Sequence, residues 1–213
     1  MTLYQPATLM TDCLLAALAA WLAWRLHASM PSTNLASHWW SRALALTAIS
    51  ALVGGGYHGF ASNLPESLSN LWWILTLLAI GILSAAMDFS LLHEFTATNR
   101  QKPWRWFIVL KLSAFSVGVI AHPVFFVAIL DYGITMLAWA ALAAASRRVW
   151  CGWMLVAIGL SFAAALVQQS RWSPLVHFNH NDIYHMIQAL ALIGFYCAGR
   201  HFGNEIALQK PKG

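Results

Sequence analysis

Histidine is concentrated at two places in this chain where it could bind a metal ion. His58 ends a glycine-rich run, and His180 and His185 lie in a polar segment near the C-terminus. Imidazole is the commonest side-chain ligand of zinc, and a catalytic zinc site has three protein ligands and one position open for water. We expect Zn²⁺ to be held by His58 and His185. The third ligand is expected to be His180, with Asp182 and His177 as alternatives.

Carboxylates near these histidines could move a proton. A zinc-bound water has a pKa lowered to about 7, and an adjacent carboxylate can orient it or take its proton. We expect Asp131 and Asp182 to be the catalytic carboxylates. Each assignment has a structural alternative, because Asp182 could cap a helix and the histidines could simply form hydrogen bonds at the membrane interface.

The elements that must position these residues are membrane-spanning helices. The chain is 60% hydrophobic and only 9% charged, which indicates an integral membrane protein. Seven continuously apolar stretches are each about 20 residues long, as a spanning helix requires. We therefore expect an all-α fold, with residues 1–213 forming a single seven-helix transmembrane domain. The expected spans are Thr8–Ala28, Ser41–Ala61, Asn70–His93, Arg105–Ala121, Pro123–Ala145, Trp150–Gln169 and Asn179–His201.

The basic residues predict the orientation of these spans. They fall almost entirely on alternate loops and the C-terminal tail, whereas the other loops carry only Arg171. Because cytoplasmic loops are enriched in Lys and Arg, we expect the N-terminus outside and the C-terminus in the cytoplasm of a multi-pass cell-membrane protein. The net charge of +5 is thus a topology signal and gives no reason to expect nucleic-acid binding.

With alternating helices, the second span ends and the seventh begins on the same, outer side. We expect six of the following seven residues to share one outer layer: Asp12, His58, His122, Asp131, Asp182, His185 and Gln188. In the cytoplasmic half, Asp88 and Lys111 reach comparable depth, and we expect them to pair.

Local patterns mark the ends of these helices. Gly55 and Gly59 form a small-x-x-x-small face on which a neighbouring helix could pack. Asn179 or Asn181 is a good N-cap for the last helix; if that helix began at Asn181, His180 could fold back over the site. Tryptophans cluster at span ends, as interfacial anchors do: Trp39, Trp40, Trp72, Trp73, Trp104, Trp106, Trp150, Trp153 and Trp172.

The two histidine segments resemble those of the superfamily of alkaline ceramidases and adiponectin-receptor-like proteins. The resemblance implies a zinc-dependent hydrolase of lipid amide bonds. His58 occupies the place of the helix-two ligand, and His185 that of the second histidine of an HxxxH pair in helix seven. The chain departs from the family at Asn181, where the first histidine of that pair would be, and at Gly54, where the family has serine. The family's aspartate after the helix-two histidine is also missing.

We therefore expect a metal-dependent, ceramidase-like enzyme that hydrolyses a membrane lipid amide or ester near the outer leaflet. The alternative is a haem- or ligand-binding membrane protein, an electron carrier or sensor without hydrolase activity, because two histidines on facing helices can also ligate haem.

Overall fold

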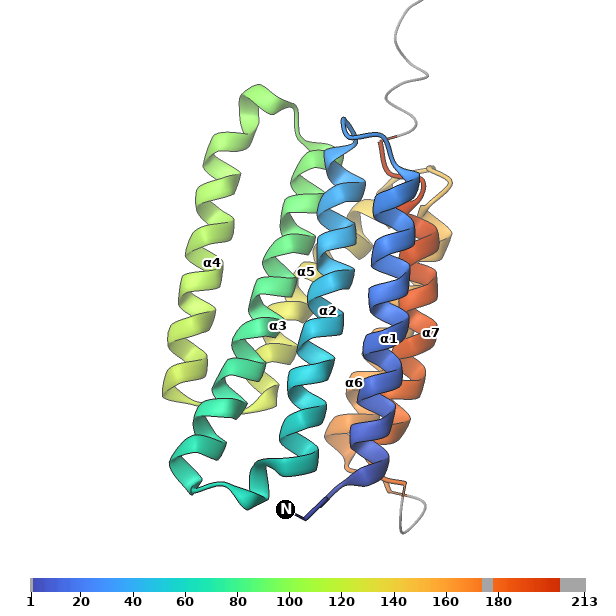
Figure 1. The fold of residues 1–213 in the computed structure, drawn as a ribbon. Coiled ribbons are helices and arrows are strands. Elements are labelled where there is room, and N and C mark those ends of the chain that lie inside the picture. The colour runs from blue at the N-terminus through green and yellow to red at the C-terminus, as the bar shows by residue number, and fades with distance from the viewer. Residues whose placement is uncertain (1, 174–177, 204–213) are drawn as a thin grey trace, which may run out of the picture.

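The chain is a bundle of seven α-helices in the computed structural model, which describes residues 2–173 and 178–203 (Figure 1). No strand occurs among the described residues, so the predicted all-α class is confirmed. Six of the described helices, α1 to α6, are long and apolar enough to cross a membrane. The helices are α1 (Pro6–Ser29), α2 (Leu35–Phe60), α3 (Glu66–Phe95), α4 (Gln101–Ala121), α5 (Phe125–Ala145), α6 (Cys151–Ser170) and α7 (His180–Gly199).

Helix ends differ from the predicted spans where the polar flanks are helical too. The predicted division between the fourth and fifth helices is confirmed, since α4 ends at Ala121 and α5 begins at Phe125. In contrast, α2 begins six residues before the predicted Ser41, capped by the Asn34 side chain, which accepts the Ser37 N–H. Apolarity marks the part of a helix suited to hydrocarbon, whereas the helix itself continues until a cap ends it.

The helices pack so that sequence-distant ends lie together. Helix α1 packs between α2 and α7, α6 packs on α7, and α3 packs on α2, α4 and α5. Helix α4 lies at the edge of the bundle and has few buried residues (Figure 1). The start of α1, the end of α2 and the start of α7 share the end of the bundle at which the N-terminus lies (Figure 1). We call it the histidine end, after His58, His180 and His185.

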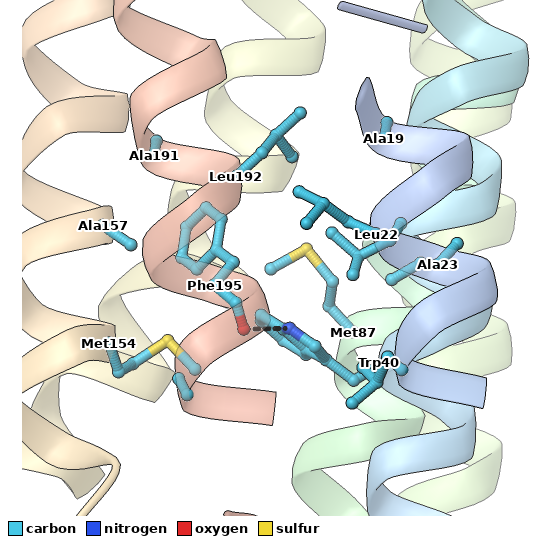
Figure 2. Packing of buried hydrophobic residues seen from close by; sticks show 14 of the residues in the cluster. Ala19, Leu22, Ala23, Trp40, Met87, Met154, Ala157, Ala191, Leu192 and Phe195 are labelled. Carbon is cyan, nitrogen blue, oxygen red and sulfur yellow. Dashed lines mark hydrogen bonds between the residues drawn. The ribbon is translucent and has the colours of Figure 1, made fainter. Parts of the chain in front are cut away.

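The opposite end holds a tightly packed aromatic cluster. The Trp40 indole Nε1 donates a 2.9 Å hydrogen bond to the Phe195 carbonyl oxygen (Figure 2). A Cβ on Gly199 would lie only 2.5 Å from Trp40 Cδ1, so glycine is required for this close approach. Trp139 and Phe202 stack on each other with centroids 4.9 Å apart. These contacts fix the indole of Trp40 in the core.

The interfacial role predicted for the tryptophans is therefore wrong at two positions. Trp40 and Trp150 are buried in the core, each at most 1% exposed, because their rings fill the space between helix ends. Four others are exposed on the bundle surface, as expected of anchors: Trp104, Trp106, Trp153 and Trp172.

Candidate functional site

Hydrogen bonds join three helix ends at the histidine end. The Tyr4 N–H donates to the Gly59 carbonyl (3.2 Å), which ties the start of the chain to α2. The Asn179 side-chain amide donates to Thr8 Oγ1 (3.2 Å), which ties the start of α7 to α1. The structure thus brings the end of α2 and the start of α7 to one end of the bundle, with α1 joining them.

The first turn of α7 is fixed by a capping box. The Asn179 side chain accepts the Asn181 N–H (2.8 Å), and Asp182 Oδ2 accepts the Asn179 N–H (2.6 Å). Asp182 therefore caps the start of α7, which is the structural alternative to its predicted catalytic role. The helix begins at His180 and not at Asn181, so His180 is part of the helix and does not fold back over the site from a loop. The His180 Nδ1 lies 3.3 Å from Ser173 Oγ.

His185 is held through both ring nitrogens. Its Nε2 lies 3.1 Å from Asp12 Oδ1, and its Nδ1 lies 3.0 Å from Thr11 Oγ1. The Thr11 hydroxyl is also 3.3 Å from Asp182 Oδ1, which links the imidazole to the helix cap. A carboxylate on one imidazole nitrogen fixes the orientation of the ring, as in catalytic Asp–His pairs.

Asp12 is a buried carboxylate with one oxygen left over. Its side chain is 5% exposed; Oδ1 lies 3.1 Å from His185 Nε2, but Oδ2 has no hydrogen-bond partner in the part of the chain that the structure describes. Gly55 of α2 makes this position possible, because a Cβ there would lie 2.7 Å from Asp12 Cβ. Part of the glycine run thus serves close packing of α1 on α2, as the sequence predicts. A buried carboxylate oxygen without a partner is costly and calls for a functional explanation.

Asp12 opens into a cavity of about 720 Å³ inside the bundle. Its wall at the histidine end includes the polar side chains of His58, His180, His185 and Gln168, beside apolar residues at the start of α5. Farther in the wall becomes apolar and reaches the aromatic cluster, with these lining residues: Trp40, Leu44, Leu83, Met87, Met136, Leu192 and Phe195. The volume is in the range of small-molecule sites, and the change from polar to apolar suits an amphiphile.

The three predicted zinc ligands line this one cavity without forming a metal site. Among the described residues, no group of three His, Cys, Asp or Glu side chains is arranged to hold a metal ion. Both His185 nitrogens are already engaged, by Thr11 and Asp12, and His180 contacts Ser173. His58 makes no hydrogen bond within the described part of the chain and lies edge-on to Trp73. Coordination by this set would need His185 to leave one partner. The alternative ligand His177 lies outside the described residues.

Asp131 lies in a different cluster from the histidines. Its Oδ1 is 3.1 Å from Lys111 Nζ, and Lys111 also binds Asp88 Oδ2 at 2.9 Å. The predicted pairing of Asp88 with Lys111 is confirmed, but Asp131 joins it instead of the outer layer. Counting residues along the helices had placed Asp131 nearer the outer side than Asp88. The long side chain of Lys111 reaches both carboxylates in spite of this difference in depth. Neither Asp131 nor Asp182 lines the cavity.

Asp12 and Thr11 are the site residues that the sequence did not single out. Asp12 was expected in the outer polar layer, but an aspartate one turn into a helix can equally be hydrated. The feature of the sequence that indicates a site is the position of Asp12 inside an apolar span, because an ionisable side chain there costs free energy. Which neighbour it would meet depends on how α1 is rotated.

Comparison with known proteins places the chain in a family but gives it no function. The model of the family of unknown function DUF6962 matches residues 7–204, which include all seven helices apart from Pro6, the first residue of α1. The chain belongs to the DUF6962 family. No curated protein and no solved structure matches it. The resemblance to alkaline ceramidases and adiponectin-receptor-like proteins therefore stays a prediction, and function must be argued from the site.

Proposed function

We propose that this chain is an intramembrane hydrolase that takes a single-chain lipid amide or ester into its cavity and cleaves it beside Asp12. The observation that carries this proposal is Asp12, a buried carboxylate on the cavity wall whose Oδ2 has no hydrogen-bond partner among the described residues. Oδ1 is held by His185, so the carboxylate is oriented before a substrate arrives.

The shape of the cavity supports a lipid substrate. Polar side chains gather at its end near Asp12, although apolar ones also line that end, and its other end is lined mainly by apolar and aromatic residues. An amphiphile would place its amide or ester at the polar end and its hydrocarbon chain in the apolar part. Transfer of the hydrocarbon chain from water into the apolar part of the cavity is favourable by about 0.8 kcal/mol per CH₂.

The residues at the polar end can perform hydrolysis as a general-base reaction. A water beside Asp12 attacks the carbonyl carbon and gives its proton to the Asp12 carboxylate, which forms a tetrahedral intermediate. Asp12 then passes this proton to the leaving nitrogen or oxygen as the C–N or C–O bond breaks, so the carboxylate is regenerated. His185 keeps the carboxylate in place, and His58 is near enough to the polar end to donate a hydrogen bond to the carbonyl oxygen.

Zinc is not required by this scheme. Metal held by His58 and His185, with His180 as third ligand, stays a prediction, as do catalytic roles for Asp131 and Asp182. The proposal includes a cell-membrane location with the histidine end outside, which is supported by the apolar helices and the distribution of basic residues.

The test is turnover by the full chain reconstituted in lipid vesicles, with fatty N-methylamides and methyl esters as substrates. Asp12→Asn keeps the shape of the side chain but removes the base, and it should lower kcat by at least about 100-fold. Asp88→Asn is the matched control, because it makes the same change in the other buried cluster. Equal activity of Asp12→Asn and wild type would refute the role of Asp12.

A second candidate is a sensor that binds the amphiphile without cleaving it, which the same cavity would serve. Binding of the substrates without product formation by the wild type would favour this function over hydrolysis.

A further inference from the structure

The inner end of the cavity is lined by buried aromatic side chains. Trp40 and Phe195 line this end, and the rest of the aromatic cluster packs behind them. We propose that Trp40 is the floor of a chain-length ruler, so that the site selects amphiphiles with one unbranched chain of about 12 to 18 carbon atoms. This inference rests on the proposed function, since it names the substrate class of the same site.

The length follows from the helices that run along the cavity. Asp12 lies at the level of Gly55 on α2 and of His185 on α7. From Gly55 to Trp40 the rise along α2 is about 22 Å, and from His185 to Phe195 the rise along α7 is about 15 Å. An extended chain advances about 1.2 Å per bond, so the space between Asp12 and the floor fits about 12 to 18 bonds.

The wall supports a single extended chain. The α2 positions that face the cavity, from Trp40 through Leu44, Thr47 and Ala51 to His58, recur every three or four residues and so form one continuous helix face. The Thr47 hydroxyl donates a 3.0 Å hydrogen bond to the Ala43 carbonyl oxygen. Because its donor is used within the helix, this part of the wall is effectively apolar. This face offers one unbranched chain a continuous path along α2 from the polar end to Trp40.

The floor is rigid enough to set a limit. Trp40 is held by its hydrogen bond to the Phe195 carbonyl, by close packing on Gly199, and by edge contacts with Trp139 and Phe202. Figure 2 shows the indole reaching across to α7, with its nitrogen on the Phe195 carbonyl oxygen. A chain that is too long would have to displace this cluster, and overpacking of such a core is unfavourable.

The experiment compares chains of different length on the purified full chain in detergent. Fatty N-methylamides of 10, 12, 14, 16, 18 and 22 carbons are added at equal mole fraction, and the rise in Tm measures binding. We expect the apparent affinity to fall at least about tenfold between the best chain and the 22-carbon chain.

Two variants move the floor. Leu44 lies one turn above Trp40 on the cavity wall, so Leu44→Trp should raise the floor by about 6 Å and shorten the best chain by about five carbons. Thr47→Phe should shorten it further and serves if Leu44→Trp does not fold. Leu14→Trp is the matched control, because Leu14 is 63% exposed on the outside of the bundle; its length profile should equal that of the wild type.

The outcomes separate the two proposals. Binding of every length with similar affinity, or a limit that neither Leu44→Trp nor Thr47→Phe moves, would overturn the ruler and leave the proposed function standing. Failure of every chain to bind the wild type would overturn the proposed function itself.

Discussion

The buried cluster around Lys111 gives the most quantitative prediction. The Lys111 ammonium donates to Ser84 Oγ (2.8 Å), Asp88 Oδ2 (2.9 Å) and Thr135 Oγ1 (2.8 Å), and it lies 3.1 Å from Asp131 Oδ1. All three ammonium protons are used, and one cation serves two carboxylates. The charged side chains are at most 15% exposed. Replacing Lys111 by methionine therefore leaves two buried carboxylates without a cation.

The cost can be estimated from what each variant leaves behind. Removal of one partner of a buried ion pair costs about 3–5 kcal/mol, and we expect Lys111→Met to lie at the upper end because two carboxylates are affected. Asp88→Asn should cost less, since Lys111 still has Asp131. Adding Asp88→Asn to Lys111→Met should recover about 0.5–3 kcal/mol, the usual coupling of contacting residues, and adding Asp131→Asn should recover more.

The assay is equilibrium unfolding of the detergent-solubilised full chain, with the free energy of unfolding compared across the single, double and triple variants. Lys102→Met is the control, because Lys102 is exposed and its loss should change the free energy by no more than about 0.5 kcal/mol. Losses that simply add from Lys111→Met to the double variant would show that Lys111 and Asp88 are not coupled, and would refute the cluster.

Three further predictions concern the histidine end. If zinc binds there, the protein purified without chelator contains one zinc per chain, and a chelator lowers its Tm. His185→Ala should abolish both effects, whereas His93→Ala should not. Metal-free wild type, or a haem-like visible absorption, would exclude the zinc site. Gly55→Ala should lower the free energy of unfolding by about 1–3 kcal/mol, because its Cβ would meet Asp12 at 2.7 Å. Gly159→Ala has nothing within 4 Å and should be neutral or stabilising, so equal effects of the two would argue against close packing. A reporter that is active only in the cytoplasm should be active when fused to the C-terminus; activity at the N-terminus instead would place the histidine end inside.

Helix number and the placing of His58, His180 and His185 at one end of the bundle could be predicted from the sequence. A spanning helix must be long and apolar, and consecutive helices with short loops must alternate in direction, so length and order alone place helix ends on one side or the other. The pairing of Lys111 with Asp88 could be predicted for a related reason. A charge inside the membrane needs a partner at similar depth, and depth can be counted along a helix.

Only the tertiary structure decided which side chains meet across the helices. The sequence placed Asp131 with the histidines, whereas the fold pairs it with Lys111. It placed Asp12 in the outer polar layer without naming a partner, whereas the fold sets it against His185 and the cavity. The physical reason is rotation. A helix that is apolar on every side carries no stripe to mark its inward face, so its rotation is set by close contacts such as Gly55 on Asp12, which exist only once the bundle is packed.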